Sequence, residues 1–333
     1  MTHAKNIAYD TVLAILSMSL VALVIILFLF CKKKPVESEE SLPTKLSACP
    51  YSLMDIHTAT DGFNHRRIIG EGRIGTVYGA VLPNSELVAV KRIHPQLVLT
   101  QAGFGFSSVV KWLSLADHSH VVPILGFSEA PGERIIIMEL ASMMSLDFYL
   151  HQNSDGASLL DWDRRLRIAA GAARGVEYLH EVMVPHVVHG CIKPSNILID
   201  VKFCARVCDY GLSFLGPNEV RGLEGYVDDE YRVERKGCSK ECDVYGFGVV
   251  LLELLSGRRS EEGWSLVHWA LPLIKDTKFS ELLDPRLVIP SNLKPLVRMA
   301  KVALACVANC RENRPSIVHV AAILNNLEMD QCF

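Results

Sequence analysis

The stretch His189-Gly190-Cys191-Ile192-Lys193-Pro194-Ser195-Asn196 decides the expected fold, because other motifs stand around it in a set order. Upstream lie the glycine-rich Gly70-Glu71-Gly72-Arg73-Ile74-Gly75-Thr76-Val77 and the apolar run Val88-Ala89-Val90-Lys91. Downstream lie Asp209-Tyr210-Gly211 and Gly225-Tyr226-Val227-Asp228-Asp229-Glu230. A glycine-rich turn alone occurs in many proteins, so the prediction rests on the order and spacing of the whole set.

These motifs resemble those of protein kinases, in which a glycine-rich loop, a strand lysine, a catalytic loop H-R-D-x-x-x-x-N and D-F-G follow one another. Within that class the chain is similar to the plant-type receptor-like kinases of the Pelle-related group, through residues 51–63, 171–180 and 243–254. The resemblance covers roughly residues 51–328. It implies an α+β, bilobal protein-kinase-like fold, with a small β-rich N-lobe and a larger α-helical C-lobe.

The resemblance also implies a site for ATP and Mg2+. In this family glycine N–H groups approach the phosphates, a lysine contacts the α- and β-phosphates, and an asparagine and an aspartate hold the metal. The matching nucleotide-binding residues are Gly70, Gly72, Gly75, Val77, Ala89, Lys91, Glu139 and Ala141, and the matching magnesium ligands are Asn196 and Asp209. The alternative is that these residues persist only as elements of the fold, so nucleotide binding stays open at this stage.

The catalytic loop departs from the family pattern at its chemical centre. Cys191 stands at the position of the Asp that accepts the substrate's hydroxyl proton, and Gly190 at that of the Arg, whereas Lys193 is retained. A thiol with a pKa near ~8.5 is mostly neutral at pH 7 and is a poor substitute for that carboxylate. The catalytic set is therefore not intact, and we expect little phosphoryl transfer.

The helix acid that pairs with the strand lysine in this family is missing too. Counting back from His118-Ser119-His120-Val121-Val122 places Val109 at its position. No Asp or Glu occurs in residues 88–116, so a shifted alignment does not restore the acid. We expect Lys91 to contact Asp209 instead.

The activation segment offers few sites for regulation by phosphorylation. From residue 212 to 227 the only hydroxyl side chains are Ser213 and Tyr226, and Leu223 stands where the family has Thr. With Gly190 at the Arg position, that position has no cation to bind a phosphate. Switching by phosphorylation of this segment is not expected.

The packing residues of the family, by contrast, are matched. The resemblance assigns a regulatory hydrophobic column to Leu113, Leu125, Tyr210 and His189, an ion pair to Glu230 and Arg314, and the carboxylate that braces the catalytic loop to Asp243. The simpler interpretation of each is ordinary packing, which also fits a kinase fold.

The N-terminal region predicts a membrane anchor. Residues 11–31 are almost wholly apolar and reach about 30 Å as a helix, the thickness of a bilayer core. Lys32, Lys33 and Lys34 follow at once, which places the C-terminal bulk in the cytoplasm. A cleaved signal peptide is the competing interpretation, but this apolar run is long and no small-x-small cleavage site precedes the lysines.

The expected organisation is a single-pass plasma-membrane protein whose N-terminus lies outside. Its predicted parts are a short extracellular N-terminus (1–10), a transmembrane helix (11–31), a juxtamembrane linker with a short helix (32–63), an N-lobe (64–141), a C-lobe (142–328) and a C-terminal tail (329–333). The net charge of −3 over 333 residues does not favour nucleic acid as a partner.

Together these features favour a membrane-anchored receptor-like kinase homologue that is a pseudokinase. It would act as a signalling scaffold or co-receptor with other receptor-like kinases. Two alternatives stay open: a weakly active, atypical serine/threonine kinase that uses Asp209, Asn196 and Lys193, and a conformational switch gated by ATP.

Overall fold

The computed structural model describes residues 18–19, 23, 47–83, 85–100, 105–140, 143–153, 159–216, 222–232, 237–261 and 265–330. Most of the predicted transmembrane segment and of the linker before residue 47 lies outside these ranges. So does the predicted border between the lobes at residues 141 and 142. Among the described residues, no helix has both the length and the apolar character that crossing a bilayer requires.

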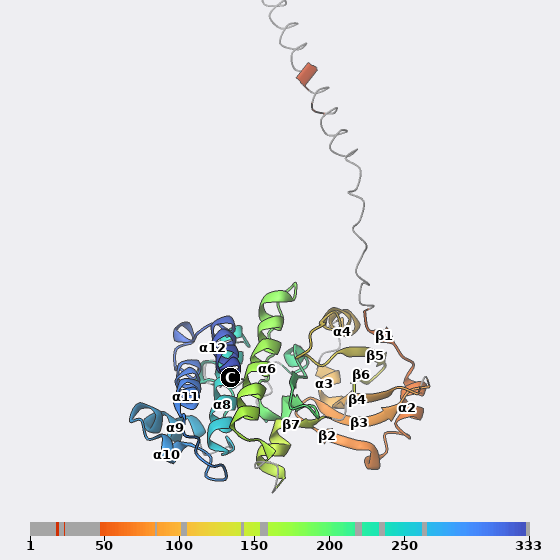
Figure 1. The fold of residues 1–333 in the computed structure, drawn as a ribbon. Coiled ribbons are helices and arrows are strands. Elements are labelled where there is room, and N and C mark those ends of the chain that lie inside the picture. The colour runs from red at the N-terminus through yellow and green to blue at the C-terminus, as the bar shows by residue number, and fades with distance from the viewer. Residues whose placement is uncertain are drawn as a thin grey trace, which may run out of the picture. The chain divides into compact units, whose positions relative to one another are not determined.

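The smaller lobe is built on a six-stranded sheet with the strand order β1-β5-β6-β4-β3-β2 (Figure 1). Its strands are β1 (Cys49–Pro50), β2 (Ile68–Glu71), β3 (Gly75–Val81), β4 (Leu87–Ile93), β5 (Ile124–Ala130) and β6 (Glu133–Glu139). Strand β1 runs parallel to β5, and the other neighbours are antiparallel. Because β2, β3 and β4 follow one another as hairpins, the glycine-rich turn lies beside the strand that carries Lys91.

Three helices accompany this sheet, namely α2 (Leu53–Ala59), α3 (Pro95–Thr100) and α4 (Phe106–Leu113), together with the turn η1 (His65–Arg67). Helix α2 begins after Ser52, whose Oγ accepts a hydrogen bond from the Asp55 N–H at 3.1 Å. Its Ile56 is fully buried in a cluster with apolar residues of β4 and β6. Helix α4 buries Phe106, Val110 and Leu113, which recur at the spacing of one helix face.

The larger lobe is mainly helical and also holds a sheet of three short strands, β7-β8-β9 (Figure 1). Its elements are β7 (Met144–Ser145), η2 (Phe148–Gln152), α6 (Trp162–Glu177), η3 (Tyr178–Val182), η4 (Pro194–Asn196), β8 (Ile197–Ile199), β9 (Ala205–Val207), η5 (Leu212–Leu215), α7 (Asp229–Arg232), α8 (Lys240–Ser256), α9 (Leu266–Lys275), α10 (Phe279–Leu282), α11 (Lys294–Cys306), η6 (Arg311–Asn313) and α12 (Ile317–Met329). The predicted helical C-lobe is thereby confirmed.

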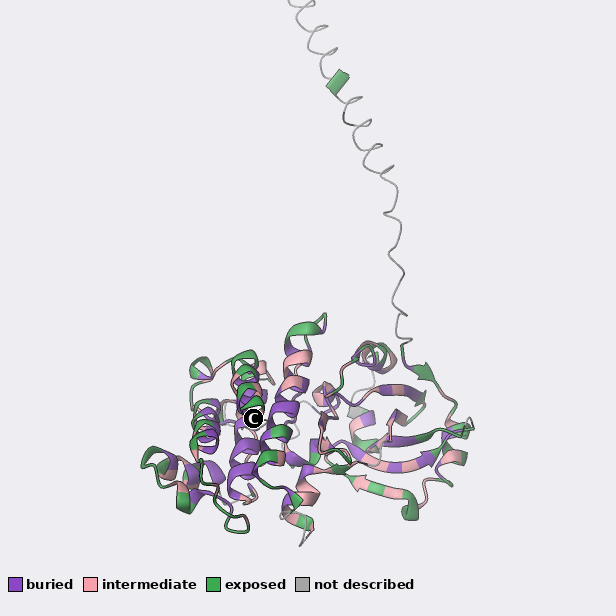
Figure 2. Ribbon diagram, viewed as in Figure 1, coloured by how far each residue is buried: buried purple, intermediate pink, exposed green. Residues whose placement is uncertain are grey.

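Helix α8 forms the centre of this lobe and is buried on nearly every side, as Figure 2 shows. A helix that is apolar all round belongs in a protein core rather than on its surface. Two buried acids nevertheless lie on it, Asp243 with an exposed fraction of 2% and Glu253 with 0%. Both accept hydrogen bonds from segments of the candidate site, so α8 is the support on which that site is built.

One predicted packing residue is misplaced. Leu125 was assigned to a column with Leu113 and Tyr210, but it packs against the second cluster of the small lobe, with Ile56. Its neighbour Ile124 lies in the main core with Leu113 and Tyr210 instead. Successive side chains of a strand point to opposite faces, so an error of one residue changes the cluster to which the side chain belongs.

Candidate nucleotide site and catalytic loop

The loop His189–Asn196 is held in place by a buried carboxylate on α8. Asp243 accepts hydrogen bonds from the backbone N–H of His189 at 2.7 Å and of Gly190 at 2.8 Å. The ring of His180, at the end of the preceding helical segment, contacts the same carboxylate at 2.8 Å. The predicted bracing role of Asp243 is confirmed, and the residue at position 191 takes no part in these bonds.

Cys191 lies among apolar neighbours. It is buried in a small cluster with Leu223, Tyr231 and Cys242, which we call the apolar plug. Burial raises the pKa of the Cys191 thiol, an effect that the nearby cations of Lys193 and Arg73 only partly offset. The cavity beside it measures about 10 Å3, close to the minimum for a single water molecule. A neutral thiol in such a place cannot act as a general base.

Lys91 reaches the aspartate that was expected to replace its missing helix partner. Its ammonium group forms an ion pair with the Asp209 carboxylate, and the Lys91 side chain is almost fully buried. Burial alone would raise the pKa of Asp209, but the charge and hydrogen bond of Lys91 outweigh it and lower that pKa. Val109, on α4, packs against the main core. The expectation of a Lys91–Asp209 contact is confirmed.

Most of the predicted nucleotide-contacting residues come together on three adjacent strands. Gly70 lies in β2, Gly75 and Val77 in β3, and Ala89 and Lys91 in β4. Val77 pairs directly with Lys91 across the β3–β4 ladder. Within the turn, the Gly72 N–H donates to the Gly75 carbonyl at 3.0 Å.

The end of β6 completes this region. The Glu139 N–H donates to the Pro123 carbonyl, and its carboxylate accepts two hydrogen bonds from Arg206 at 3.0 and 3.2 Å. Ala141 lies outside the described residues. The Glu139 side chain therefore ties β6 to β9, a contact that sequence reasoning did not anticipate.

The residues expected to hold magnesium offer suitable donors. The Asn196 amide nitrogen donates to the Cys191 carbonyl at 2.9 Å, which leaves its side-chain oxygen as an acceptor. Asp209 supplies an ionised carboxylate in a left-handed backbone conformation, with φ of 62°. Carboxylate and amide oxygens are the ligands that hard divalent cations prefer, so this pair fits Mg2+.

Two cations connect this region to the activation segment. Arg73, at the tip of the glycine-rich turn, donates to the Gly216 carbonyl at 3.1 Å. Lys193, from the loop below, donates to the Gly222 carbonyl at 2.8 Å. Sequence reasoning gave Arg73 no role, and the only available signal was its position between two glycines of the turn.

The far end of the activation segment is fixed by a buried ion cluster. Asp228 has an exposed fraction of 2%. Its carboxylate accepts two hydrogen bonds from Arg311 at 2.9 Å and one from Arg314 at 2.5 Å. Glu230 contacts Arg311, at 3.7 Å. The predicted Glu230–Arg314 ion pair is therefore wrong. Asp228, and not Glu230, pairs with Arg314.

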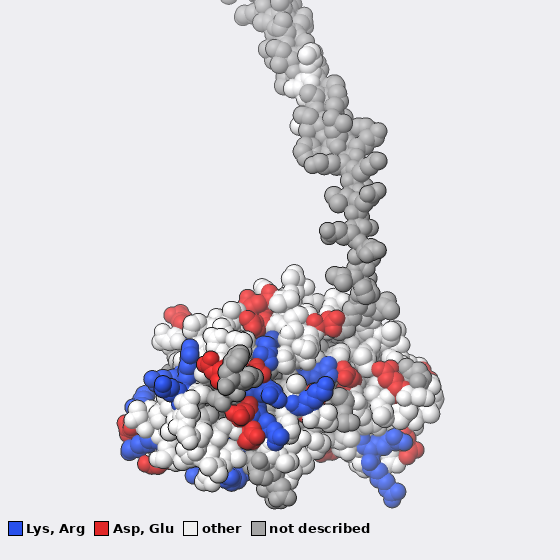
Figure 3. All heavy atoms as spheres, in the orientation of Figure 1, with Lys and Arg blue, Asp and Glu red and all other residues white. Residues whose placement is uncertain are grey.

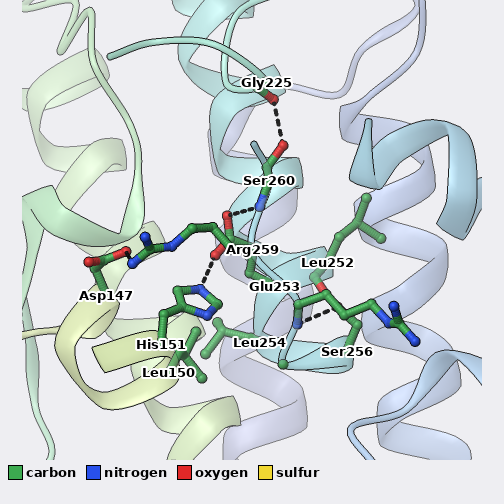
Figure 4. Close-up of polar contacts among 12 residues, drawn as sticks. Asp147, Leu150, His151, Gly225, Leu252, Glu253, Leu254, Ser256, Arg259 and Ser260 are labelled. Atoms are coloured by element: carbon green, nitrogen blue, oxygen red, sulfur yellow. Dashed lines mark hydrogen bonds and ion pairs between the residues drawn. The ribbon is translucent and has the colours of Figure 1, made fainter. Parts of the chain in front are cut away.

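A second buried acid holds the adjoining tyrosine. The Tyr226 hydroxyl donates to Glu253 Oε1 at 2.5 Å, and His151 contacts the other carboxylate oxygen at 2.5 Å. Figure 4 shows Glu253 between His151 and Ser260. The Ser260 hydroxyl donates a hydrogen bond to the Gly225 carbonyl. Burial and the neighbouring carboxylate raise the pKa of Tyr226 far above its ordinary value. One of the two hydroxyl residues of this segment is thereby hydrogen-bonded to a buried acid.

Comparison with known proteins agrees with this arrangement. The protein kinase domain family matches residues 63–320 of the chain. This chain belongs to that family. It is 36% identical over 289 residues to the leucine-rich repeat receptor protein kinase EMS1 of Arabidopsis thaliana. The aligned region covers 83% of this chain and 24% of that protein. It is 36% identical over 307 residues to the nodulation receptor kinase of Pisum sativum, covering 86% of this chain and 33% of that protein.

The chain therefore spans less than half the length of these plant receptor kinases. Among solved structures, it is similar to the pseudokinase domain of BIR2, an immune regulator of the RLK/Pelle family. The TM-score is 0.69 at 33% identity, over 84% of this chain and 87% of that one. The bilobal protein-kinase fold and the relationship to plant receptor-like kinases are thus established.

The ion cluster around Asp228 makes this kinase-family fold sensitive to one substitution. Asp228→Ala leaves two largely buried guanidinium groups without their shared acid. We expect the free energy of unfolding at pH 7 to fall by about 3–5 kcal/mol, measured by urea denaturation. Glu312→Ala, at an exposed position beside the two arginines, is the control and should cost about 0.5 kcal/mol or less.

The stability that Asp228→Ala loses should become smaller as the pH falls. Burial opposes ionisation of Asp228, yet the hydrogen bonds from Arg311 and Arg314 lower its pKa from 3.8 to about 2. A lowered folded-state pKa gives stability that is present above pH 3.8 and is lost as the pH falls toward about 2. The difference between wild type and Asp228→Ala should shrink across that window. A difference that stays constant would contradict the ion-pair account.

Proposed function

We propose that this chain is a membrane-anchored pseudokinase that acts by binding other proteins rather than by phosphoryl transfer. The observation that carries the proposal is the apolar plug: Cys191 stands at the position of the catalytic base and is packed against Leu223, Tyr231 and Cys242. General-base assistance is worth roughly 10²–10⁴ in rate, or about 3–5 kcal/mol of barrier. The loss of the helix acid at Val109 weakens phosphate positioning in addition.

The proposed anchor is the apolar stretch of residues 11–31, followed at once by three lysines. It would place the kinase-like domain in the cytoplasm at the plasma membrane, with the N-terminus outside. The lobes would then span residues 64–141 and 142–328, after a linker that ends at residue 63. A protease-protection assay on sealed vesicles that found the kinase-like domain on the outside would contradict this orientation.

The proposed partners are other receptor-like kinases at the membrane, with the kinase-like domain as the docking surface. Similarity to the pseudokinase domain of BIR2, which is described as an immune regulator, supports a regulatory rather than an enzymatic role. Basic and acidic side chains are interspersed on the face that Figure 3 shows, which suits protein contacts better than nucleic acid. A full-length protein that cross-links to no receptor kinase in plasma membrane would contradict this role.

Nucleotide binding is a separate part of the proposal, favoured by the retained cleft residues. Gly70, Gly72 and Gly75 would face the phosphates, Val77 and Ala89 the adenine, and the backbone at Glu139 and Ala141 its edge. Lys91 would contact the α- and β-phosphates, while Asn196 and Asp209 would hold Mg2+. Bound Mg2+ would neutralise phosphate charge, and the protein groups would fix the position of the nucleotide.

A thermal-shift titration tests the binding. We expect ATP with Mg2+ to raise the unfolding temperature of the chain, because a ligand at about 100 times its Kd stabilises by about 2.7 kcal/mol. That stabilisation corresponds to an increase of roughly 5 °C or more in the unfolding temperature of a domain of this size. Lys91→Ala should abolish the shift, whereas Lys202→Ala, at an exposed position, should preserve it. A melting temperature unmoved by ATP with Mg2+ and with Mn2+ would exclude both nucleotide binding and an ATP-gated switch.

Restoring an aspartate at position 191, the position of the catalytic base, tests whether the apolar plug accepts a charged side chain. Cys191→Asp places a carboxylate among Leu223, Tyr231 and Cys242, and a buried charge that the nearby cations of Lys193 and Arg73 only partly offset is costly. We expect a loss of about 2–4 kcal/mol in urea denaturation and no recovered activity. Cys310→Asp, at an exposed cysteine, is the matched control and should be nearly neutral.

A stable Cys191→Asp variant that turns over substrate would instead favour the alternative of a weakly active serine/threonine kinase.

A further inference from the structure

Helix α4 is the element that carries Val109, so the ion pair to the strand lysine cannot position it. Lys91 is paired with Asp209 instead. The helix packs its apolar face on β5, where Phe106 and Phe127 meet edge to face with ring centroids 6.4 Å apart. The C-terminal end of α4 is contacted by a second segment, the one that precedes α2.

That segment, residues 48–51, is called the strap here. Cys49 and Pro50 pair with Gly126 and Phe127 as the parallel strand β1, at the edge of the sheet. The Tyr51 N–H extends the pairing by donating to the Phe127 carbonyl at 2.8 Å. The strap is therefore fastened along the strand on which α4 rests.

The strap also bonds directly to the C-terminal end of α4. The Ala48 N–H donates to Ser114 Oγ at 2.8 Å, and that hydroxyl donates in turn to the Lys111 carbonyl in the last turn of the helix. Ser114 is fully buried, and Ala48 lies in the main core with Val110 and Leu113. One short piece of chain thus touches both the helix and its supporting strand.

The fit of the strap depends on a glycine beneath it. A Cβ atom at Gly126 would lie 2.4 Å from Tyr51 Cε2 and 2.7 Å from the Cys49 carbonyl oxygen. Both distances are far below ordinary contact, so any side chain at this position displaces the strap. By contrast, a Cβ at Gly237 would meet nothing within 4 Å.

We propose that the strap is the positioning element of α4, which it clamps against β5 in place of the missing ion pair. Release of the strap from its seat therefore frees the helix. If residues 11–31 are the membrane anchor proposed above, the strap joins that anchor to α4, so that a partner bound near the membrane acts on the helix. The clamp itself depends neither on the anchor nor on nucleotide, and its test is separate from theirs.

Hydrogen exchange of the full-length chain in detergent micelles tests the clamp. In Gly126→Ala the amides of α4 should exchange about tenfold faster or more, while those of α8 keep their wild-type rates. Gly237→Ala is the matched control and should leave both helices unchanged. Protection of α8 shows in the same experiment that the variant is folded.

A milder variant provides a second measurement. Ser114→Ala leaves the Ala48 N–H buried without its acceptor, and exchange of α4 should rise about tenfold. Ser108→Ala, at an exposed site on the same helix, should have no such effect. The proposal is overturned if the strap amides exchange faster in these variants while α4 stays protected. It is equally overturned if Gly126→Ala leaves strap and helix protected as in the wild type.

Discussion

The hydrogen bonds to the Asp243 carboxylate are the interaction on which the site depends. They join the most buried helix of the large lobe to the backbone of His189 and Gly190. Because they engage backbone N–H groups, they shape the loop whatever side chain follows at position 191. The chain can therefore keep the geometry of a kinase catalytic loop with Cys191 at the position where the family motif has Asp. The shape of the loop depends on backbone N–H groups, whereas its chemistry depends on the side chain at position 191.

The candidate site divides into two chemical halves. On one side Lys91, Asp209 and Asn196 form a polar set that suits phosphate and a divalent cation. On the other side Cys191 and Leu223 belong to an apolar cluster in which a carboxylate would be costly. A nucleotide and a substrate hydroxyl would approach from these two sides respectively. We infer that the molecule has kept the groups that bind and lost the group that reacts.

Two buried acids hold the C-terminal part of the activation segment. Asp228 shares its carboxylate between Arg311 and Arg314, and Tyr226 is bonded to the buried Glu253. Buried pairs of this kind are strongly destabilising to break. Residues 226 and 228, in the described part of the segment, are therefore held by buried ion pairs and hydrogen bonds.

Much of this could be predicted from the sequence, because the motifs carry their spacing with them. The bilobal fold followed from the resemblance that these motifs carry, and the Lys91–Asp209 pair from the lack of an acid in residues 88–116. The errors have physical causes. The choice of Leu125 over Ile124 was one residue out along a strand. The acid paired with Arg314 was assigned by resemblance to Glu230, two residues from Asp228, which holds that place in the structure. Strand β1 has two residues, one of them Pro50, and its pairing with β5 is a long-range contact that no local pattern indicates.

The most direct test of the central claim is the rate of phosphate transfer from labelled ATP by the purified full-length protein. The assay uses a generic protein substrate with Mg2+ or Mn2+, and the Asp209→Ala variant sets the background. The account predicts a rate far below the ~1 per second at the lower end of active kinases, and no different from that variant. Sustained turnover that Asp209→Ala abolishes would contradict it.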